Sequence, residues 1–354
     1  MQNLDALKDA AVDMTIGSVV YAQEFEHVSS SDPIEAMTEE AGWISSINRP
    51  LIMGIYAYHP PIVQLITSAK RLMRGIANAC GFEEHIFPRH YGLHDLRSFG
   101  WVDNADLASQ LMVIRPLTAA SPDARGNDLT LGDPLQCIGF YEMLLHVQNR
   151  LGGHLPSEFF DEGPFCVYED QGGWTLRNES TERLSLGWGT SFEFSGAELV
   201  FAGSSQQVYD ARWAVLCSVA QLLTELRITH RVVVAKPCSH VAPVQGSDKA
   251  GRRIFEADTL DIQAYIPQYE GSRDPWLELG GGDVAGDTLT SAFGIRLSSE
   301  EPLYSGCQGL GWQRFALAVL SQLGTNPVNW PNRLQSEYGL QVPASRISKL
   351  YHVI

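Results

Sequence analysis

A short segment near the end of the chain has residue types and spacing suited to binding phosphate. It reads Cys307-Gln-Gly-Leu-Gly-Trp-Gln-Arg314. Gly309 and Gly311 have no side chain, so a flat ligand can lie close against their backbone. Arg314 falls in the first turn of the helix expected next, where its guanidinium group can reach a phosphate. A glycine pair before a helix is also common in ordinary loops, so other motifs must support this site.

The residues that follow must form the helix that positions Arg314. Apolar residues recur there with helical spacing, at Trp312, Phe315, Val319, Leu320 and Leu323. Gly324 stands where glycine commonly ends a helix, and Pro327 lies just beyond it. The segment is not a dinucleotide-binding fingerprint, because Arg314 occupies the position of the third glycine.

The segment from Cys307 to Gly324 resembles motif 3 of the class II aminoacyl-tRNA synthetases. With Cys307 directly before the glycines and Asn326-Pro-Val-Asn-Trp-Pro331 after the helix, it most resembles the amino acid:carrier protein ligases. Those are homologues of the atypical, zinc-dependent archaeal seryl-tRNA synthetases. The resemblance implies an α+β fold in which helices flank an antiparallel β-sheet core, assembled as a homodimer. It divides the chain into an N-terminal arm of uncertain structure (1–50) and a catalytic domain (51–354).

An amphipathic helix followed by a short strand resembles motif 1, the dimer-forming element of this class. The spacing of apolar residues predicts a helix from Pro61 to Cys80, and a strand follows that ends at Pro88. Three basic residues share the exposed side of the helix, namely Lys70, Arg71 and Arg74. They form either a solvated face or a docking patch for a partner.

The stretch from Gly163 to Gly203 has a composition typical of β-strands. Residues 165–177 read as a hairpin that turns at Gln171-Gly-Gly. Segments 174–179 and 192–200 resemble the two antiparallel strands of motif 2. The resemblance implies that Arg177 binds the α-phosphate of ATP, that Glu179 helps to hold the adenine, and that Arg183 lies in the intervening loop. Val167-Tyr-Glu169 is a rival register for this motif, without an arginine.

Three residues far apart in sequence match the zinc ligands of the resembling family, namely Cys137, Glu198 and Cys307. Ser121 competes with Cys137 for the first position, but a thiolate binds zinc and a serine hydroxyl does not. The alternative is that Cys137 is a buried cysteine that packs as a small apolar residue. Three protein ligands leave one position of a tetrahedral zinc open, and the resemblance implies that the α-amino group of the substrate occupies it.

Three further strands are expected before motif 3, at Leu260–Pro267, Pro275–Gly282 and Ala292–Leu297. Glu278, in the second of them, is the candidate ligand for the magnesium ion bound to ATP, because Mg²⁺ on phosphates takes one or two carboxylates. Gln263 stands where the synthetases carry an acidic residue, so the number of magnesium ions is open. Gly280–Gly282 replace the serine and asparagine common at those positions, so the amino acid is open as well.

Composition and charge exclude several classes of protein. The 354 residues include 25 Lys+Arg and 41 Asp+Glu, a formal charge of −16. A net negative charge disfavours nucleic acid as a partner, because phosphate binding depends on basic surfaces. The six cysteines show no CxxC spacing, which is typical of reduced thiols in the cytosol. Neither a signal peptide nor a run of about 18 apolar residues is present, so a cytoplasmic protein without membrane segments is expected.

The resemblance implies one reaction and leaves its acceptor open. ATP and an amino acid would form an aminoacyl-adenylate, which would then pass the aminoacyl group to the phosphopantetheine thiol of a carrier protein. The first 50 residues leave room only for a short arm in place of a tRNA-binding domain, so tRNA is not expected as the acceptor. A small-molecule acceptor is the first alternative. A non-catalytic paralogue that serves as a binding module is the second, supported by Gln263 and by the glycines at 280–282.

Overall fold

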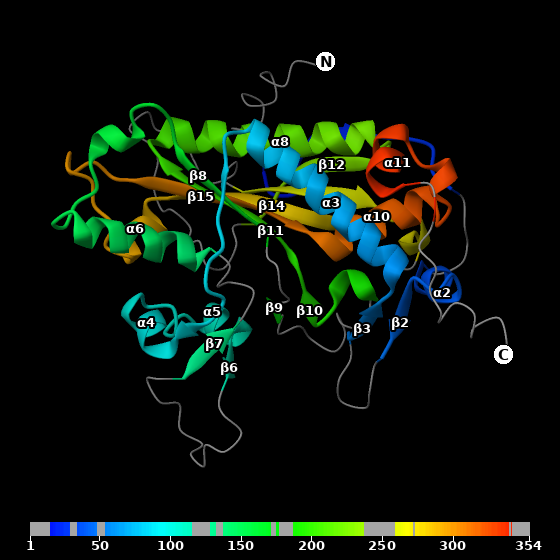
Figure 1. Ribbon diagram of the computed structural model, residues 1–354, viewed down its shortest axis with the longest axis horizontal. Coiled ribbons are helices and arrows are strands. Elements are labelled where there is room, and N and C mark those ends of the chain that lie inside the picture. Colours follow the sequence, from blue (N-terminus) through cyan, green and yellow to red (C-terminus); the bar gives the residue numbers. More distant parts are fainter. Residues whose placement is uncertain are drawn as a thin grey trace, which may run out of the picture.

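An eight-stranded β-sheet forms the centre of the computed structural model (Figure 1), which describes residues 15–28, 34–47, 54–114, 128–131, 137–170, 175–176, 187–236, 259–271, 273–339 and 341. Neighbouring strands pair antiparallel except at one edge, where β4 runs parallel to β8. The order across the sheet is β1 (Val19–Gln23), β12 (His230–Val234), β13 (Thr259–Tyr265), β14 (Trp276–Gly286), β15 (Tyr304–Gly311), β11 (Gly196–Gly203), β8 (Phe165–Asp170) and β4 (Glu83–Glu84). This arrangement confirms the expected α+β fold with an antiparallel core.

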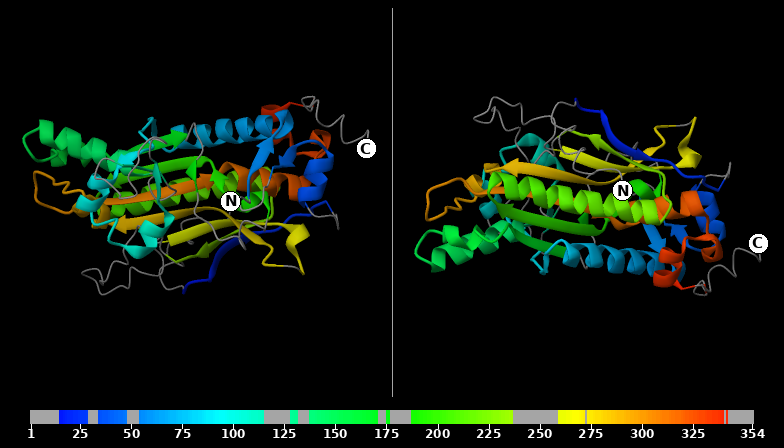
Figure 2. Two further views of the ribbon diagram at one scale, coloured as in Figure 1. Left: turned by 90° about the horizontal axis from the view of Figure 1, so that it is seen from below. Right: turned by 90° about the horizontal axis from the view of Figure 1, so that it is seen from above.

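Three long helices cover one face of the sheet. They are α3 (Pro60–Ala79), α8 (Ser205–Glu225) and α10 (Trp312–Leu323), and Figure 2 shows α8 running along the sheet. A capping box starts α8: the Ser204 hydroxyl accepts from the Gln207 amide, and the Gln207 side chain accepts from the Ser204 amide. Gly324 ends α10 with a φ of 73°, a conformation that glycine adopts without strain. The expected helices of motif 1 and motif 3 are therefore present.

A second, smaller core lies on the opposite face, between the sheet and the helices α6 (Ile138–Arg150) and α9 (Thr288–Ala292). Side chains alternate between the two faces along a strand. On β11, Leu199 and Phe201 belong to the large core on the α8 side of the sheet, whereas Val200 and Ala202 belong to the core on the α6 side. The sheet therefore separates two hydrophobic layers, and α6 covers only part of the second face.

Smaller elements lie around the sheet. Three elements precede residue 50: β1 pairs with β12, while α2 (Ile34–Glu40) and β2 (Ile44–Ser46) contribute Ile34 and Ile44 to the large core. Below the sheet in Figure 1 lies a three-stranded sheet with two short helices, α4 (Leu93–Ser98) and α5 (Ala105–Gln110). Its strands are β5 (Tyr91–Gly92), β7 (Leu129–Leu131) and β6 (Met112–Ile114). Two further antiparallel pairs are β2 (Ile44–Ser46) with β3 (Tyr56–Tyr58) and β9 (Thr175–Leu176) with β10 (Glu193–Phe194).

The structure corrects two sequence-based expectations about strands. The predicted hairpin across Gln171-Gly-Gly does not form, because β8 pairs with β11 and β4 while β9 pairs with β10. Burial explains the choice: β8 is largely buried between β4 and β11, so the central sheet takes both of its edges. The strand expected at Ala292–Leu297 is also absent: α9 ends at Ala292, and Leu297 makes only a single bridge to Leu155. Of the two strands expected for motif 2, only Thr175–Leu176 and Glu193–Phe194 pair antiparallel, whereas residues 196–200 of the second segment belong to β11 in the central sheet.

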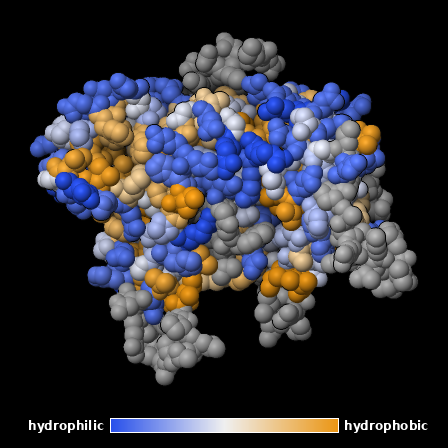
Figure 3. All heavy atoms as spheres, viewed as in Figure 1, coloured by the Kyte–Doolittle hydropathy of each residue, from blue (hydrophilic) through white to orange (hydrophobic). Residues whose placement is uncertain are grey.

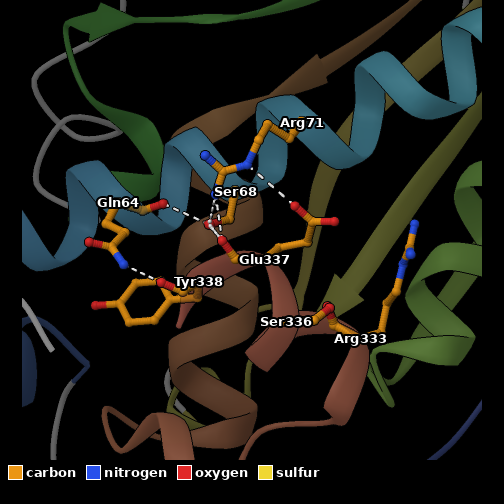
Figure 4. A network of polar contacts seen from close by, with 7 residues as sticks. All are labelled: Gln64, Ser68, Arg71, Arg333, Ser336, Glu337 and Tyr338. Carbon is orange, nitrogen blue, oxygen red and sulfur yellow. Dashed lines mark hydrogen bonds and ion pairs between the residues drawn. The ribbon is translucent and has the colours of Figure 1, made fainter. Parts of the chain in front are cut away.

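The C-terminal helix α11 (Asn332–Tyr338) is attached to α3 by a polar network (Figure 4). Arg71 pairs with the Glu337 carboxylate, with 3.3 Å between Nε and Oε2, and also donates to the Glu337 carbonyl oxygen. The Gln64 side chain donates to the carbonyl oxygen of Tyr338, whose hydroxyl donates to the Pro61 carbonyl. Helix α11 therefore fixes the segment after motif 3 against the helix of motif 1.

Candidate active site on the second face of the sheet

The strand register places several predicted functional residues on one face of the central sheet. In the β11–β15 pair, Glu198 is opposite Gly309 and Val200 is opposite Cys307. Residues directly opposite each other on antiparallel strands project to the same face, as do residues two apart on one strand. Glu198 and Cys307 therefore share the face that α6 partly covers, and Cys137 stands at the N-cap of α6.

The three predicted zinc ligands, Cys137, Glu198 and Cys307, are all buried. Burial raises the pKa of the Cys137 thiol well above its usual value, and the nearby Glu198 carboxylate raises it further. Burial also raises the pKa of Tyr141, with smaller contributions from Cys137, Cys307 and Glu198, so all three lie near its ring. Two thiols and a carboxylate are donor types that suit zinc. Among the described residues, however, no group of three His, Cys, Asp or Glu side chains is arranged to hold a metal ion.

Arg314 is fixed at the open end of this face. Its side chain is only 4% exposed, and Nε donates to the carbonyl oxygen of Gly189 over 3.1 Å. Nη1 donates to the Glu278 carbonyl over 3.0 Å and lies 3.2 Å from the Glu278 carboxylate oxygen Oε2. The predicted phosphate-binding arginine and the predicted magnesium-binding carboxylate are therefore neighbours, although they come from α10 and β14.

Asp261 is a candidate site residue that the sequence analysis missed. It lies on β13 opposite Gly281, two residues before Gln263. The pKa of Asp261 is raised to about 8, first by burial and then by the charges of Glu278 and Asp283, while Arg314 opposes the rise. The Gln263 side chain, in contrast, accepts a hydrogen bond of 2.8 Å from Arg231. Period-two alternation puts positions 261 and 263 on the same face, and that signal could have identified Asp261.

Asp283 adds another carboxylate to this face. It is 2% exposed, lies opposite Cys307 in the β14–β15 pair, and accepts a hydrogen bond of 2.5 Å from the Thr259 hydroxyl. Its charge contributes to the raised pKa values of both Cys137 and Asp261. Asp283 therefore lies between the predicted zinc ligands and the carboxylates near Arg314. Carboxylates are abundant on this face, which favours the binding of divalent cations.

The glycines of β14 and β15 serve two different purposes. A Cβ atom on Gly280 would lie 1.9 Å from the Gly309 carbonyl oxygen, so glycine there permits close strand contact. A Cβ atom on Gly309 would lie 3.4 Å from the nearest atom, Oε2 of Glu198, so the backbone there is open to the site face. At Gly311 a Cβ atom would lie 2.7 Å from the Phe194 ring, which therefore covers this glycine. The expectation of an open backbone applies to Gly309 and not to Gly311.

Phe194 is a second residue that the sequence analysis did not assign. Its ring lies against Gly311, and the Arg314 side chain approaches the same glycine from the next turn, with Cδ 3.6 Å from the position of a Cβ atom. An aromatic ring and a guanidinium group side by side can both stack on a flat ligand. The alternation Phe192-Glu-Phe194 at the end of motif 2 is the sequence signal that could have identified it.

Several predicted residues lie outside the described part of the chain. These are Arg177, Glu179 and Arg183 of motif 2, and Ser121, the alternative to Cys137. The backbone of Thr175–Leu176, directly before Arg177, pairs with Glu193–Phe194. Glu169, the carboxylate of the rival register, is buried opposite Glu198 on the neighbouring strand and accepts a hydrogen bond of 3.2 Å from the Phe87 amide.

Comparison with known proteins gives relatives of one kind, although no protein-family model matches the chain. The type-2 serine–tRNA ligase of Methanococcoides burtonii is 25% identical over 349 residues, covering 90% of this chain and 64% of that protein. The corresponding ligase of Methanopyrus kandleri is 24% identical over 337 residues, covering 86% and 60%. The chain therefore spans less than two thirds of the length of these curated relatives.

Solved structures of seryl-tRNA synthetases have the same fold. The M. kandleri enzyme, crystallised with A. aeolicus tRNASec, matches with a TM-score of 0.76 and 21% identity, covering 95% of this chain and 67% of that one. The Naegleria fowleri enzyme in complex with AMP matches with a TM-score of 0.70 and 13% identity, covering 93% and 74%. The strand order, the flanking helices and these matches agree. This chain therefore has the fold of the class II aminoacyl-tRNA synthetases.

Proposed function

We propose that this chain activates an amino acid with ATP to form an aminoacyl-adenylate and pyrophosphate. A carboxylate oxygen of the amino acid forms a bond to the α-phosphorus, and the bond to the pyrophosphate leaving group breaks. The observation that carries the proposal is the convergence of Arg314, Glu278 and Asp261 at the open end of the face that also holds Glu198 and Cys307. Such a reaction needs positioning and charge stabilisation, and no covalent protein intermediate.

The described residues divide the binding of Mg·ATP between them. Arg314 is held by two backbone carbonyls, which fix the position of its guanidinium group, and we assign this group to the γ-phosphate. Glu278 and Asp261 supply the carboxylates for Mg²⁺, and Phe194 supplies an aromatic surface for the adenine. The roles implied by motif 2 are kept in this proposal. Arg177 binds the α-phosphate, Glu179 helps to hold the adenine, and Arg183 lies in the intervening loop.

Cys137, Glu198 and Cys307 are the residues that would hold zinc. Their donor types fit the metal, and a zinc ion with one open position would keep the α-amino group of the substrate unprotonated and fixed. The strand register puts Glu198 and Cys307 on the same face as Gly309, whose backbone is open there. An amino group bound near Cys307 leaves the substrate carboxylate free to point toward the phosphate site at Arg314.

Two acceptors for the aminoacyl group have support. The curated relatives are named as serine–tRNA ligases, and one structural match was crystallised with tRNA, which favours tRNA. The formal charge of −16 and the resemblance at Cys307 to the carrier protein ligases favour the phosphopantetheine thiol of a carrier protein. On α3, Lys70, Arg71 and Arg74 all form ion pairs within the chain, which disfavours the docking patch. A small-molecule acceptor is the third possibility.

The predicted homodimer has a candidate surface. Ile86, just after the edge strand β4, is 91% exposed, and Phe159 is 56% exposed. The rings of Phe159 and His85 both contact Phe165, so this surface extends from the 3-10 helix η3 (Ser157–Phe160) to the residue after β4. Figure 3 shows apolar side chains gathered at this end of the molecule. Light scattering on an Ile86→Asp variant tests the assignment: a dimer that becomes a monomer supports it, and an unchanged mass rejects it.

Amino-acid-dependent ATP–pyrophosphate exchange tests the proposed reaction. The panel should include small, polar and cationic amino acids, because Gly280–Gly282 replace the expected seryl-type contacts. Exchange with one or a few amino acids that is lost in Arg314→Ala would establish activation. Absence of exchange across the panel would reject it and favour a non-catalytic binding module. The acceptor is then identified by offering radiolabelled amino acid with total tRNA, with a phosphopantetheinylated carrier protein, or with neither.

A further inference from the structure

Three neighbouring basic residues on α3 have partners in different parts of the fold. Arg71 pairs with Glu337 of α11 (Figure 4), and Arg74 pairs with Glu84 of β4 over 2.6 Å. Lys70 pairs with Asp170 of β8, with 2.9 Å between Nζ and Oδ1. The first two pairs connect α3 to elements away from the candidate site. The third connects it to the end of a strand that borders the site.

The Lys70–Asp170 pair is more protected from solvent than its neighbours. The two side chains are 27% and 14% exposed, compared with 46% and 42% for Arg74 and Glu84. Partly buried charges are less screened by water and salt than exposed charges. The Lys70–Asp170 pair can therefore contribute more to positioning than the exposed pairs.

Lys70 makes a second contact, with the first residue of α10. Its Nζ atom lies 5.8 Å from the centre of the buried Trp312 ring, within the range of a cation–π interaction. The Trp312 amide donates to the Ser195 carbonyl over 2.9 Å, and the Gln313 side chain contacts both the amide and the hydroxyl of Ser195. Arg314 follows directly. The start of α10, which sets the position of Arg314, is thus anchored next to the Lys70 ammonium group.

Asp170 lies shortly before the first segment that resembles motif 2. It is the last residue of β8 and the register partner of Ala197, beside the buried pair Glu169 and Glu198. From Asp170 the chain continues to β9, whose last residue directly precedes Arg177. The ammonium group of Lys70 therefore contacts the start of α10, which carries Arg314, and the end of β8, which lies seven positions before Arg177 in the sequence.

We propose that Lys70 is a positioning residue for the ATP site, which it serves by holding the end of β8 and the start of α10 at a fixed separation. The inference rests on the proposed function, because it assigns Lys70 a role in binding ATP. It also separates Lys70 from Arg71 and Arg74, which share its helix and its charge but pair with Glu337 and Glu84. Those two residues provide matched controls.

The test is the dissociation constant of Mg·ATP, measured by calorimetry on the full chain without an amino acid. Lys70→Met and Asp170→Asn should each weaken binding roughly fivefold, the size expected for the loss of one partly buried ion pair. Lys70→Arg keeps the charge and should remain within about twofold of the wild-type value. Arg71→Met and Arg74→Met should also stay within about twofold. The KM for the amino acid in the exchange assay should not change in any variant.

The outcomes distinguish this inference from the proposed function. If the wild-type chain binds Mg·ATP and Lys70→Met binds as tightly as the two controls, the inference is wrong and the function stands. Equal weakening by all three substitutions on α3 would also overturn it, because the effect would then follow net charge or helix stability. If the wild-type chain does not bind Mg·ATP, both fail. Should Lys70→Met not fold, Asp170→Asn removes the same ion pair from the other side and decides the question.

Discussion

Arg314 and Glu278 form an ion pair, with 3.2 Å between Nη1 and Oε2, although 36 positions of sequence separate them. The guanidinium group is almost fully buried, whereas the Glu278 side chain is 44% exposed. The carboxylate is therefore the solvent-accessible partner of the pair. We expect ATP phosphates to replace Glu278 as the partner of Arg314, which releases Glu278 to bind Mg²⁺.

Substitution of Glu278 should separate magnesium binding from the other parts of ATP binding. In Glu278→Gln the side chain keeps its size but loses its charge, so we expect the Mg²⁺ concentration for half-maximal exchange to rise roughly tenfold. The measurement is exchange activity against Mg²⁺ at saturating ATP. The control is Glu337→Gln, which removes a carboxylate of α11 that pairs with Arg71 of α3. This variant should behave as wild type. The same Mg²⁺ requirement in both variants would contradict the assignment.

Zinc content tests the predicted ligands independently of activity. We expect the purified chain to carry about one zinc ion, and Cys137→Ser and Cys307→Ser each to lose most of it, because a serine hydroxyl does not replace a thiolate as a zinc ligand. Metal analysis of the dialysed proteins measures this directly. Cys80→Ser is the control, since Cys80 lies near Ser218 at the end of α3. Wild-type protein without zinc would remove the metal from the proposal.

Glycine substitutions should show which glycines the strand packing requires. In Gly280→Ala the new Cβ atom would lie 1.9 Å from the Gly309 carbonyl oxygen, so the strands must separate. We expect this variant to lose about 2 kcal/mol or more of unfolding free energy. Gly75→Ala, on an exposed part of α3 with no atom within 4 Å of the new Cβ, should gain about 0.5–1 kcal/mol. Chemical denaturation of both variants provides the comparison, and equal effects would contradict this packing argument.

Stability should fall in acid through His230. The imidazole is fully buried on β12, and burial lowers its pKa below the usual value near 6.5. Below about pH 6.5 the unfolded chain therefore binds more protons at His230 than the folded chain does. The contribution of the neutral His230 to the unfolding free energy is fully present above that pH and is lost as the pH falls below it. The slope reaches at most about 1.4 kcal/mol per pH unit.

The measurement is the unfolding free energy at pH 7.5 and pH 5.5. The unfolding free energy of the wild type minus that of His230→Gln should be smaller at pH 5.5 than at pH 7.5. The histidines common to both proteins cancel in each difference, so a difference that does not depend on pH would reject the role of His230.

The sequence by itself determined the local elements and the residue types of the site. Helical spacing and a terminal glycine located α10 correctly, and alternation located β13 and β14, because these signals depend on neighbours within one segment. The motif from Cys307 to Arg314 indicated the class of catalytic domain because its residues are consecutive. The roles proposed for Arg177, Glu179 and Arg183 remain predictions, since these residues lie outside the described structure.

Only the tertiary structure decided which strands pair and which side chains meet. Residues 165–177 looked like a local hairpin, but β11 and β4 occupy both edges of β8, which is largely buried between them. Alternation along β13 pointed to position 261, but the approach of Glu278 to that position depends on a bulge in β14 that brings Glu278 opposite Gln263. Lys70 looked like part of a solvated row, and its contacts with Asp170 and Trp312 appear only when α3, β8 and α10 pack together. Such contacts join residues far apart in the chain, so no local pattern in the sequence can reveal them.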